Sequence, residues 1–372
     1  MIAGERMFEA SAFSQSSLGG SRKTWLERLA RAKKSFACRR ATFDRVHDVS
    51  NTVRPCAGDL LLATVTEIGH HARLETPEGR RAQLYVGDEI VVAFGARYAP
   101  DQFEALVPED LGDCDLVAGG GIAARAVARH ARARKPTAIK PIGILTDAGG
   151  SAVNVAQFAL QPRELRPRAR NLVAVVGTSM NAGKTTAAAN LIRGLSKGGL
   201  RVGACKVTGT GSGGDIWSMR DAGAITVLDF TDVGFATTAG ADIDAIDRGA
   251  LALVAELEAE DIDIVVAEIA DGLLQQETAA LLTAPRGFAS RIDTLLLAAA
   301  DSMGAVAGAE WLRAKNLPLR AVTGLVTASP LGMREAQSQL PVEVVSSRSL
   351  AEAEVAARMS LLAVRASLIV VS

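Results

Sequence analysis

The sequence has few cysteines, few aromatic residues and no excess charge of either sign. Its four cysteines lie far apart and form no Cys-x-x-Cys pair, which argues against a zinc ribbon, a redox motif or a disulfide scaffold and favours a reducing compartment. The 41 Lys and Arg residues balance 41 Asp and Glu residues, so net charge does not predict nucleic acid as a partner. No apolar run reaches the roughly 18 residues of a membrane-spanning helix, and no signal-peptide pattern opens the chain. We therefore expect a cytoplasmic protein with no membrane partner.

The length of 372 residues predicts two domains, since a domain typically has about 100–200 residues. Residues 1–57 are expected to form a mobile Ser/Gly-rich arm and a basic amphipathic helix over 24–40. Residues 58–160 are expected to form a small β-rich α+β domain, because short strand-like runs alternate there with tight turns, as in a small antiparallel sheet or barrel. The Pro- and Arg-rich residues 161–170 are predicted to be a linker, and residues 171–372 to be a second domain.

Three features of the N-terminal half bear on its chemistry. Gly119, Gly120 and Gly121 precede an Ala- and Arg-rich stretch, residues 122–134, that predicts a helix; the glycines would either cradle an anion or form a plain turn. The adjacent His70 and His71 would point to opposite faces of a strand, which argues against a shared metal. A third group would line a substrate pocket if this half docked on the second domain: Arg97, Asp101 and Glu104.

The C-terminal half alternates uninterrupted apolar strands with amphipathic helices. Strands are expected at 172–176, 201–206, 262–268, 294–300 and 319–326, with helices at 184–197, 244–260 and 305–315. Such alternation predicts a parallel sheet with helices on both faces. The expected fold is therefore an α/β domain preceded by a small, mainly β domain.

The most informative segment follows the strand at 172–176. Gly177 and Gly183 enclose five residues, and Gly183 is followed by Lys184, Thr185 and an Ala-rich helix, as in a P-loop. In such a loop the backbone N–H groups and the helix N-terminus bind phosphate, Lys184 would reach the β- and γ-phosphates, and Thr185 would ligate Mg²⁺. The predicted nucleotide-binding residues of this loop are Gly177, Thr178, Ser179, Asn181, Ala182, Gly183, Lys184, Thr185 and Thr186.

This loop, in which Thr178 takes the usual first-glycine position, resembles that of the dethiobiotin synthetases. The resemblance covers about residues 171–350, and residues 1–170 have no counterpart in that family. It continues in the order of Asp215 and Asp221 and in three further segments. These segments are Ala204-Cys205-Lys206-Val207-Thr208-Gly209, Val265-Val266-Ala267-Glu268-Ile269-Ala270-Asp271-Gly272 and Gly324-Leu325-Val326-Thr327-Ala328-Ser329-Pro330. The family is a group of P-loop enzymes that use Mg²⁺ and ATP.

The resemblance assigns roles to residues outside the loop. It implies that Lys206 binds phosphate or a substrate carboxylate, that Asp215 lies near phosphate and metal with Asp221 behind it, and that Glu268 binds Mg²⁺. It also places Thr327 where the family reads the base, although the family's Asn-Asp pair is Thr327-Ala328 here, which leaves ATP or GTP open. The predicted catalytic residues are thus Lys184, Lys206 and Asp215, and the predicted metal ligands are Thr185, Asp215 and Glu268.

Two physical arguments stand beside the resemblance. Lys206 ends a strand at the rim where α/β sheets bind ligands, and Glu268 ends a buried strand, where an acid is costly unless it faces a cation. The Gly- and hydroxyl-rich segment 208–215 would either close over the substrate or only connect two elements. The predicted substrate-binding residues are Lys206, Thr208, Thr210, Ser212 and Asp221.

Three functions fit these motifs. The first is a Mg²⁺- and ATP-dependent enzyme, a ligase or kinase that activates a carboxylate or carbamate of a small metabolite by phosphorylation; the resemblance also implies a homodimer. The second is a GTP- or ATP-switched binding protein or metallochaperone; metallochaperones of this class present Cys or His ligands near the nucleotide, and Cys205, next to Lys206, has no such partner in the sequence. The third is an acyltransferase whose loop holds a phosphorylated donor such as coenzyme A.

Overall fold

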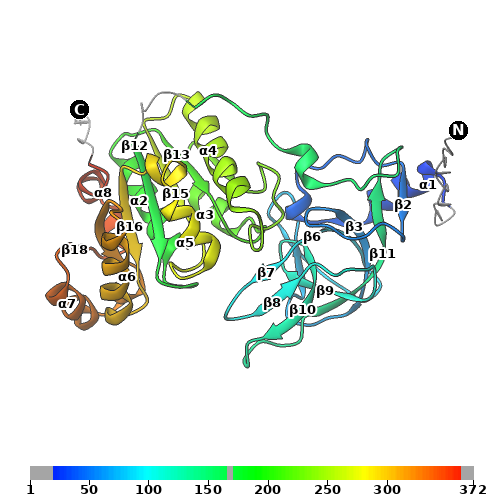
Figure 1. Cartoon of the computed structure of the whole chain (residues 1–372), viewed down its shortest axis with the longest axis horizontal. Helices are drawn as coiled ribbons and strands as arrows, with labels where there is room; N and C mark the ends of the chain where they lie inside the picture. The colour runs from blue at the N-terminus through cyan, green and yellow to red at the C-terminus, as the bar shows by residue number, and fades with distance from the viewer. Residues whose placement is uncertain (1–19, 166–170, 362–372) are drawn as a thin grey trace, which may run out of the picture.

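The computed structural model describes residues 20–165 and 171–361. It has two lobes side by side, a β-rich N-terminal lobe and an α/β C-terminal lobe (Figure 1). The arm expected at the start of the chain falls mainly on residues 1–19, which lie outside the described part, as do residues 166–170 of the expected linker. Residues 161–165 contain neither helix nor strand.

The N-terminal lobe contains one α-helix among its described residues, α1 (Arg22–Arg31), which is shorter than the predicted helix over 24–40. Lys33 and Lys34 pair instead with Ile90 and Val91 of a neighbouring strand, so the chain leaves the helix after Arg31. The strands of this lobe are β1 (Lys33–Lys34), β2 (Asp48–Ser50), β3 (Leu60–Glu67), β4 (Arg73–Glu75), β5 (Arg81–Gln83), β6 (Glu89–Phe94), β7 (Arg97–Tyr98), β8 (Phe103–Leu106), β9 (Cys114–Ala118), β10 (Ile122–Arg129) and β11 (Thr137–Thr146).

These strands close into a small barrel. The order β6-β3-β11-β9-β10 is antiparallel throughout, and β10 then pairs with β6 in parallel and closes the ring. Strands β7 and β8 form a hairpin that extends from β10, and β4 and β5 form a separate hairpin. The expectation of a mainly β N-terminal domain is confirmed.

The predicted helix over residues 122–134 is wrong, because residues 122–129 form strand β10. Alanine and arginine favour a helix locally, but Ile122, Ala123 and Ala124 are fully buried, and β10 as a whole pairs with β9, β6 and β8. Burial and pairing with three strands outweigh helix propensities of less than about 1 kcal/mol per residue. The preceding glycine run is the turn between β9 and β10, not a helix N-terminus.

The C-terminal lobe is a seven-stranded parallel sheet with the order β14-β13-β15-β12-β16-β17-β18. Helices α4, α5, α6 and α7 cover one face and α2, α3 and α8 the other, so the predicted fold class is confirmed (Figure 1). The elements are β12 (Asn171–Gly177), α2 (Lys184–Lys197), β13 (Val202–Lys206), α3 (Gly214–Asp221), β14 (Thr226–Asp229), α4 (Ile243–Ala259), β15 (Ile264–Glu268), α5 (Gln276–Thr283), β16 (Thr294–Ala298), α6 (Ser302–Ala314), β17 (Leu319–Thr323), α7 (Pro330–Gln339), β18 (Glu343–Val344) and α8 (Ala353–Met359).

The strand order determines which side chains meet at the carboxyl edge of the sheet. Strand β12, which leads into the glycine loop, lies between β15 and β16. Strand β15 therefore separates β13, which ends at Lys206, from β12. Glu268 at the end of β15 is in register with Val175 of β12 on one side and with Lys206 on the other. Among the described helices, none is long and apolar enough to cross a membrane.

Candidate functional site: a phosphate-binding loop under a hairpin of the β lobe

The loop between β12 and α2 is curled by two residues in the left-handed region. Asn181 has a φ of 64°, and Gly183, the residue that precedes the helix, has a φ of 100°. Gly177 serves another purpose: a Cβ there would lie 2.8 Å from Cγ and Cδ of Lys184. The spacing of the two glycines thus provides the turn into the helix and the room for the lysine side chain. The first N–H groups of α2 have no partner within the helix and are available to an anion.

Lys184 is folded back over this loop. Its side chain is 7% exposed, and Nζ donates a hydrogen bond to the carbonyl oxygen of Ser179 at 2.9 Å. Burial lowers the pKa of Lys184, while the nearby charges of Glu268 and Asp271 act in the opposite direction. The ammonium group is therefore held inside the loop, where a phosphate group would be its natural counter-ion.

Two carboxylates converge on the hydroxyl of Thr185. Oγ1 of Thr185 lies 3.0 Å from Oδ1 of Asp215 and 3.0 Å from Oε1 of Glu268. The other oxygen of Asp215 forms an ion pair with Nζ of Lys206. Glu268 is only 2% exposed, and its Oε2 has no hydrogen-bond partner among the described residues. A buried carboxylate oxygen without a partner is costly unless a cation approaches it.

These three residues have the chemistry of a Mg²⁺ site. A hydroxyl and two carboxylates supply hard oxygen ligands, and Mg²⁺ in nucleotide sites takes its remaining ligands from phosphate and water. No group of three or more His, Cys, Asp and Glu side chains that could hold a metal is found among the described residues; the three residues here offer one hydroxyl and two carboxylates. The buried Oε2 of Glu268, which has no hydrogen-bond partner among the described residues, fits a bound Mg²⁺ ion.

Lys184, Thr185 and the two carboxylates line a cavity with a volume of about 460 Å³, and further charged residues line it as well. Asp271 also lines it, in a left-handed conformation with a φ of 65°. Burial raises its pKa, and the charges of Lys184, Lys206 and Arg97 oppose that rise. The residues of the sequence-based prediction that line the cavity are Asn181, Gly183, Lys184, Thr185, Thr186, Lys206, Thr210, Ser212, Asp215 and Glu268.

Other predicted residues lie outside the lining. Asp221 is exposed at the far end of α3. The buried hydroxyl of Thr208 accepts a hydrogen bond from the backbone N–H of Ala270 at 2.9 Å, and the half-buried hydroxyl of Thr327 donates one to the carbonyl of Gly324 at 2.7 Å. These two hydroxyls stabilise the backbone instead of facing the cavity. The remaining predicted residues belong to the loop but do not line the cavity: Gly177, Thr178, Ser179 and Ala182.

The N-terminal lobe completes the cavity from above the loop. Oδ2 of Asp101, in the turn between β7 and β8, accepts a hydrogen bond from Nδ2 of Asn181 at 2.8 Å. Arg97 and Tyr98 of the same hairpin line the cavity. Glu104 points elsewhere, to a surface hollow beside Arg129. The sequence does not predict that the N-terminal lobe docks on the loop, because no local pattern encodes a contact between two distant parts of the chain.

Arg97 is the most unusual of these residues. It is 9% exposed, and its Nη2 donates to Oε1 of Gln102 at 2.9 Å, whereas Nε has no hydrogen-bond partner among the described residues. Burial lowers its pKa to about 10, while Asp101 and Asp271 act against this change. The guanidinium thus remains charged at neutral pH.

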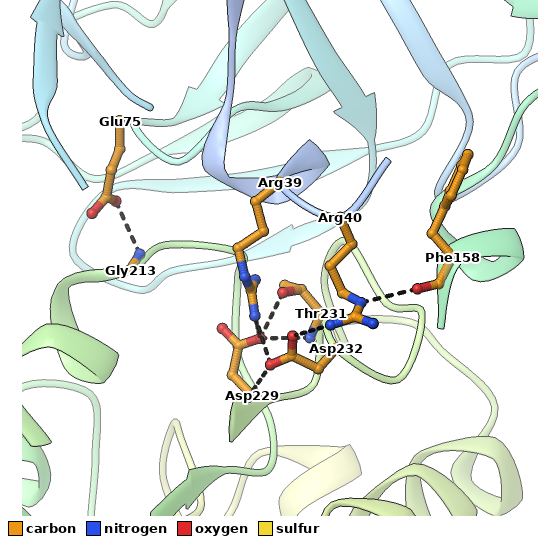
Figure 2. Close-up of polar contacts among 8 residues, drawn as sticks. All are labelled: Arg39, Arg40, Glu75, Phe158, Gly213, Asp229, Thr231 and Asp232. Carbon is orange, nitrogen blue, oxygen red and sulfur yellow. Dashed lines mark hydrogen bonds and ion pairs between the residues drawn. The ribbon is translucent and has the colours of Figure 1, made fainter. Parts of the chain in front are cut away.

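Charged contacts hold the two lobes together (Figure 2). Nη2 of Arg39 lies 3.0 Å from Oδ1 of Asp229 and 2.6 Å from Oδ2 of Asp232, and Arg40 reaches the second oxygen of Asp232 at 3.3 Å. On the other side, Glu75 accepts a hydrogen bond from the backbone N–H of Gly213 at 3.0 Å. These contacts join the β lobe to the end of β14 and to the segment before α3.

Two glycines of the β lobe allow close approach at this interface. A Cβ on Gly120, in the turn between β9 and β10, would lie 1.8 Å from the carbonyl oxygen of Gly211 in the other lobe. A Cβ on Gly79, in the turn between β4 and β5, would lie 2.4 Å from the indole nitrogen of Trp217 on α3. The lobes therefore meet with backbone against backbone and backbone against an aromatic ring.

We expect Gly120→Ala to destabilise the protein by about 1–3 kcal/mol, because the added methyl group must push the lobes apart. Gly119→Ala is the matched control, since a Cβ there would lie 3.6 Å from its nearest atom, the carbonyl oxygen of Arg73, and should change stability by less than about 0.5 kcal/mol. Urea unfolding followed by circular dichroism measures both. Equal midpoints for the two variants would contradict the close contact between the lobes.

Together, the strand, the curled glycine loop, the helix and the carboxylates define a P-loop nucleotide-binding domain. A family model described as MobB, molybdopterin guanine dinucleotide synthesis protein B, matches residues 172–275, well under half of the chain. No curated protein sequence matches the chain significantly. The dethiobiotin synthetase resemblance stays a prediction, because the matching family model is that of another P-loop family.

Solved structures of other P-loop proteins align with part of the chain. The signal recognition particle receptor FtsY from Elizabethkingia anophelis in complex with GDP aligns with a TM-score of 0.35 and 19% identity over 54% of this chain and 66% of that one. The signal recognition particle 54 kDa protein from Aeropyrum pernix K1 in complex with GDP aligns with a TM-score of 0.34 and 20% identity over 55% and 50%. The chain thus spans between half and two thirds of the length of these proteins.

Proposed function

We propose that this protein is a Mg²⁺-dependent enzyme that transfers the γ-phosphate of a nucleoside triphosphate, ATP in the first instance, to a carboxylate or carbamate of a small metabolite. The observation that carries the proposal is the convergence of Lys184, Lys206 and Arg97 on one cavity beside the Glu268 oxygen that has no partner. Phosphoryl transfer needs positioned cations around the moving group and little else from the protein.

Each residue has a defined task in this proposal. Lys184 exchanges the Ser179 carbonyl for the β- and γ-phosphates, and Lys206 balances charge on the side of the acceptor. Thr185, Asp215 and Glu268 would hold Mg²⁺, which neutralises phosphate charge when bound. The hairpin with Arg97 and Tyr98 covers the cavity and excludes water, which would otherwise compete with the acceptor for the phosphoryl group.

The nucleotide is tested directly by thermal-shift measurements with ATP, GTP and coenzyme A, each with and without Mg²⁺. A ligand at 100 times its Kd stabilises the native state by about 2.7 kcal/mol. Stabilisation by ATP with Mg²⁺ supports the proposal, and stabilisation by coenzyme A alone would instead favour acyl transfer. A turnover assay with hydroxylamine, which traps acyl phosphates, then tests the chemistry.

A second candidate is a GTP-dependent protein. Its support is the family match, whose description concerns guanine dinucleotide synthesis, together with Thr327 and Ala328, which replace the Asn-Asp pair that reads the base in the dethiobiotin synthetases. The metallochaperone form of this candidate has less support, because Cys205 is fully buried and burial raises the pKa of its thiol to about 12. A metal ligand must be a thiolate. Tighter binding of GTP than of ATP in the same measurements would favour this candidate.

We expect Glu268→Gln to raise the Mg²⁺ concentration needed for half-maximal turnover at least about tenfold, because the amide removes one anionic ligand. Glu310→Gln is the control, since Glu310 is exposed on α6 away from the cavity. The measurement is a Mg²⁺ titration of nucleotide hydrolysis at saturating nucleotide. An unchanged Mg²⁺ requirement in Glu268→Gln would remove Glu268 from the metal site.

A further inference from the structure

A second cavity adjoins the phosphate cavity on the side of the β lobe. Its volume is about 490 Å³, within the usual range of about 300–1,000 Å³ for small-molecule sites. Arg97 and Ser212 line both cavities. Apart from Ser212, its lining comes from the β lobe, the part of the chain that no family motif explained.

The lining of this cavity carries an excess of positive charge. Three arginines face it, Arg73, Arg81 and Arg97, and none of them forms an ion pair with a described residue. Glu75 is the carboxylate of the lining, and it already accepts hydrogen bonds from Oγ of Ser212 and the N–H of Gly213, both at 3.0 Å. The cavity is therefore suited to an anion, and the buried Nε of Arg97 is a donor without a partner.

A neutral histidine adds a hydrogen-bond acceptor. Nε2 of His71 lies 3.0 Å from the carbonyl oxygen of Val117; since a carbonyl only accepts, we assign the proton to Nε2 and leave Nδ1 as the acceptor. Nδ1 faces Gly119, which lines the cavity. Burial lowers the pKa of His71 to about 3, with Arg97 and His70 adding to the effect, so the ring is neutral at physiological pH.

The geometry of the two histidines differs from the sequence-based expectation. They lie between β3 and β4, not on a strand, and their ring centroids are 4.9 Å apart in an edge-to-face arrangement. Both line the second cavity instead of pointing to opposite faces. The prediction that they do not form a metal pair is not tested by this placement.

We propose that the second cavity binds the phosphoryl acceptor, and that this acceptor is a small carboxylic acid that also carries a hydroxyl or amino group. Arg73 and Arg81 hold its anionic part, Nδ1 of His71 accepts a hydrogen bond from its hydroxyl or amino group, and Arg97 orients the reacting carboxylate at the junction of the two cavities. The acceptor role depends on the function proposed above, whereas the binding of the acid does not.

The chemical step is balanced without another reactant. A carboxylate oxygen forms a bond to the γ-phosphorus, and the bond between that phosphorus and the β–γ bridging oxygen breaks. The nucleoside diphosphate leaves with that electron pair, and an acyl phosphate remains. No proton or redox equivalent is needed, because the nucleophile is already an anion.

Binding is tested on the full chain without nucleotide, by calorimetry at constant ionic strength with the hydroxy acids lactate, malate and citrate, and with succinate as the acid that lacks a hydroxyl group. We expect at least one hydroxy acid to bind more tightly than succinate, and Arg73→Gln and Arg81→Gln each to raise its Kd at least about tenfold, as loss of a charge-assisted hydrogen bond does. Arg125→Gln is the control, since Arg125 is exposed on β10 and contacts Asp110. It should leave the Kd unchanged.

The same variants separate this inference from the proposed function. Nucleotide Kd values should agree within about twofold across all four proteins, because neither Arg73 nor Arg81 lines the phosphate cavity. Binding of no acid, or equal acid affinity in Arg73→Gln and wild type, would overturn the assignment of the cavity. If an acid binds as expected but no nucleotide does, the cavity assignment stands and phosphoryl transfer is excluded.

Discussion

Replacing Lys184 by alanine is expected to weaken nucleotide binding at least ~100-fold and to abolish nucleotide turnover, because it removes a buried charge-assisted contact to phosphate. The fold should survive, since Nζ of Lys184 makes one hydrogen bond, to the Ser179 carbonyl. Burial lowers the pKa of Lys184, so removing the ammonium relieves a desolvation cost that offsets the loss of this hydrogen bond. Calorimetry with ATP and GTP measures the affinity, and circular dichroism checks the fold.

Lys197→Ala is the matched control for this experiment. Lys197 ends the same helix and donates a hydrogen bond to the carbonyl of Ala351 from an exposed position. Its loss should change nucleotide affinity by less than about twofold. Equal affinities of wild type and Lys184→Ala would mean that the loop between β12 and α2 does not bind the nucleotide.

The second large effect is expected at the interface between the lobes. Arg39→Met should destabilise the protein by about 3 kcal/mol, because it leaves the buried carboxylates of Asp229 and Asp232 without their main cation. Arg40 still reaches Asp232, and Thr231 still donates to Asp229, which places the effect at the lower end of the usual range. The free energy of unfolding in urea is the measurement.

This defect should depend on pH. Burial raises the pKa of Asp232, and Arg39 opposes that rise, so loss of Arg39 raises the pKa in the folded state further. A raised carboxyl pKa means that the folded state binds the proton more tightly than the unfolded state does, and stability is lost as pH rises through the folded pKa. The defect should therefore be larger at neutral pH than near the ordinary pKa of aspartate.

Arg201→Met is the control, because Arg201 and Asp261 form an ion pair that is largely exposed, with 48% and 79% of the two side chains accessible. Exposed pairs contribute about 0–1 kcal/mol. A similar loss of stability in Arg39→Met and Arg201→Met would show that the interface is not held by the buried carboxylates.

The sequence was most informative where local signals decide the structure. The prediction of a helix over 184–197 matches α2 to the residue, because a left-handed glycine precedes it and Gly198 follows it. The end of β15 was also correctly placed at Glu268, since an acid at the end of an apolar run marks the sheet edge. These features depend on neighbours in sequence. The sequence therefore predicts that Thr185 and Glu268 lie beside the phosphate loop.

The β lobe was less predictable because distant partners decide its structure. Residues 122–134 favour a helix locally, yet β10 pairs with β6, about thirty residues earlier in the chain. The same is true of Arg97 and His71, whose place at the phosphate cavity and beside it depends on how the lobes dock. The prediction for Asp221 fails for a different reason: its place after Asp215 in the sequence resembles a family pattern, but the residue is exposed at the end of α3, outside the site.

The contact between Gly79 and Trp217 makes the junction visible to spectroscopy. The other two tryptophans, Trp25 and Trp311, lie on α1 and α6. The indole of Trp217 packs where the lobes meet, and its buried Nε1 has no hydrogen-bond partner among the described residues. Any separation of the lobes would let water reach this indole and shift its fluorescence to longer wavelengths. A protein carrying Trp25→Phe and Trp311→Phe would thus report, by its own emission and in real time, whether the lobes part while ligands enter and leave.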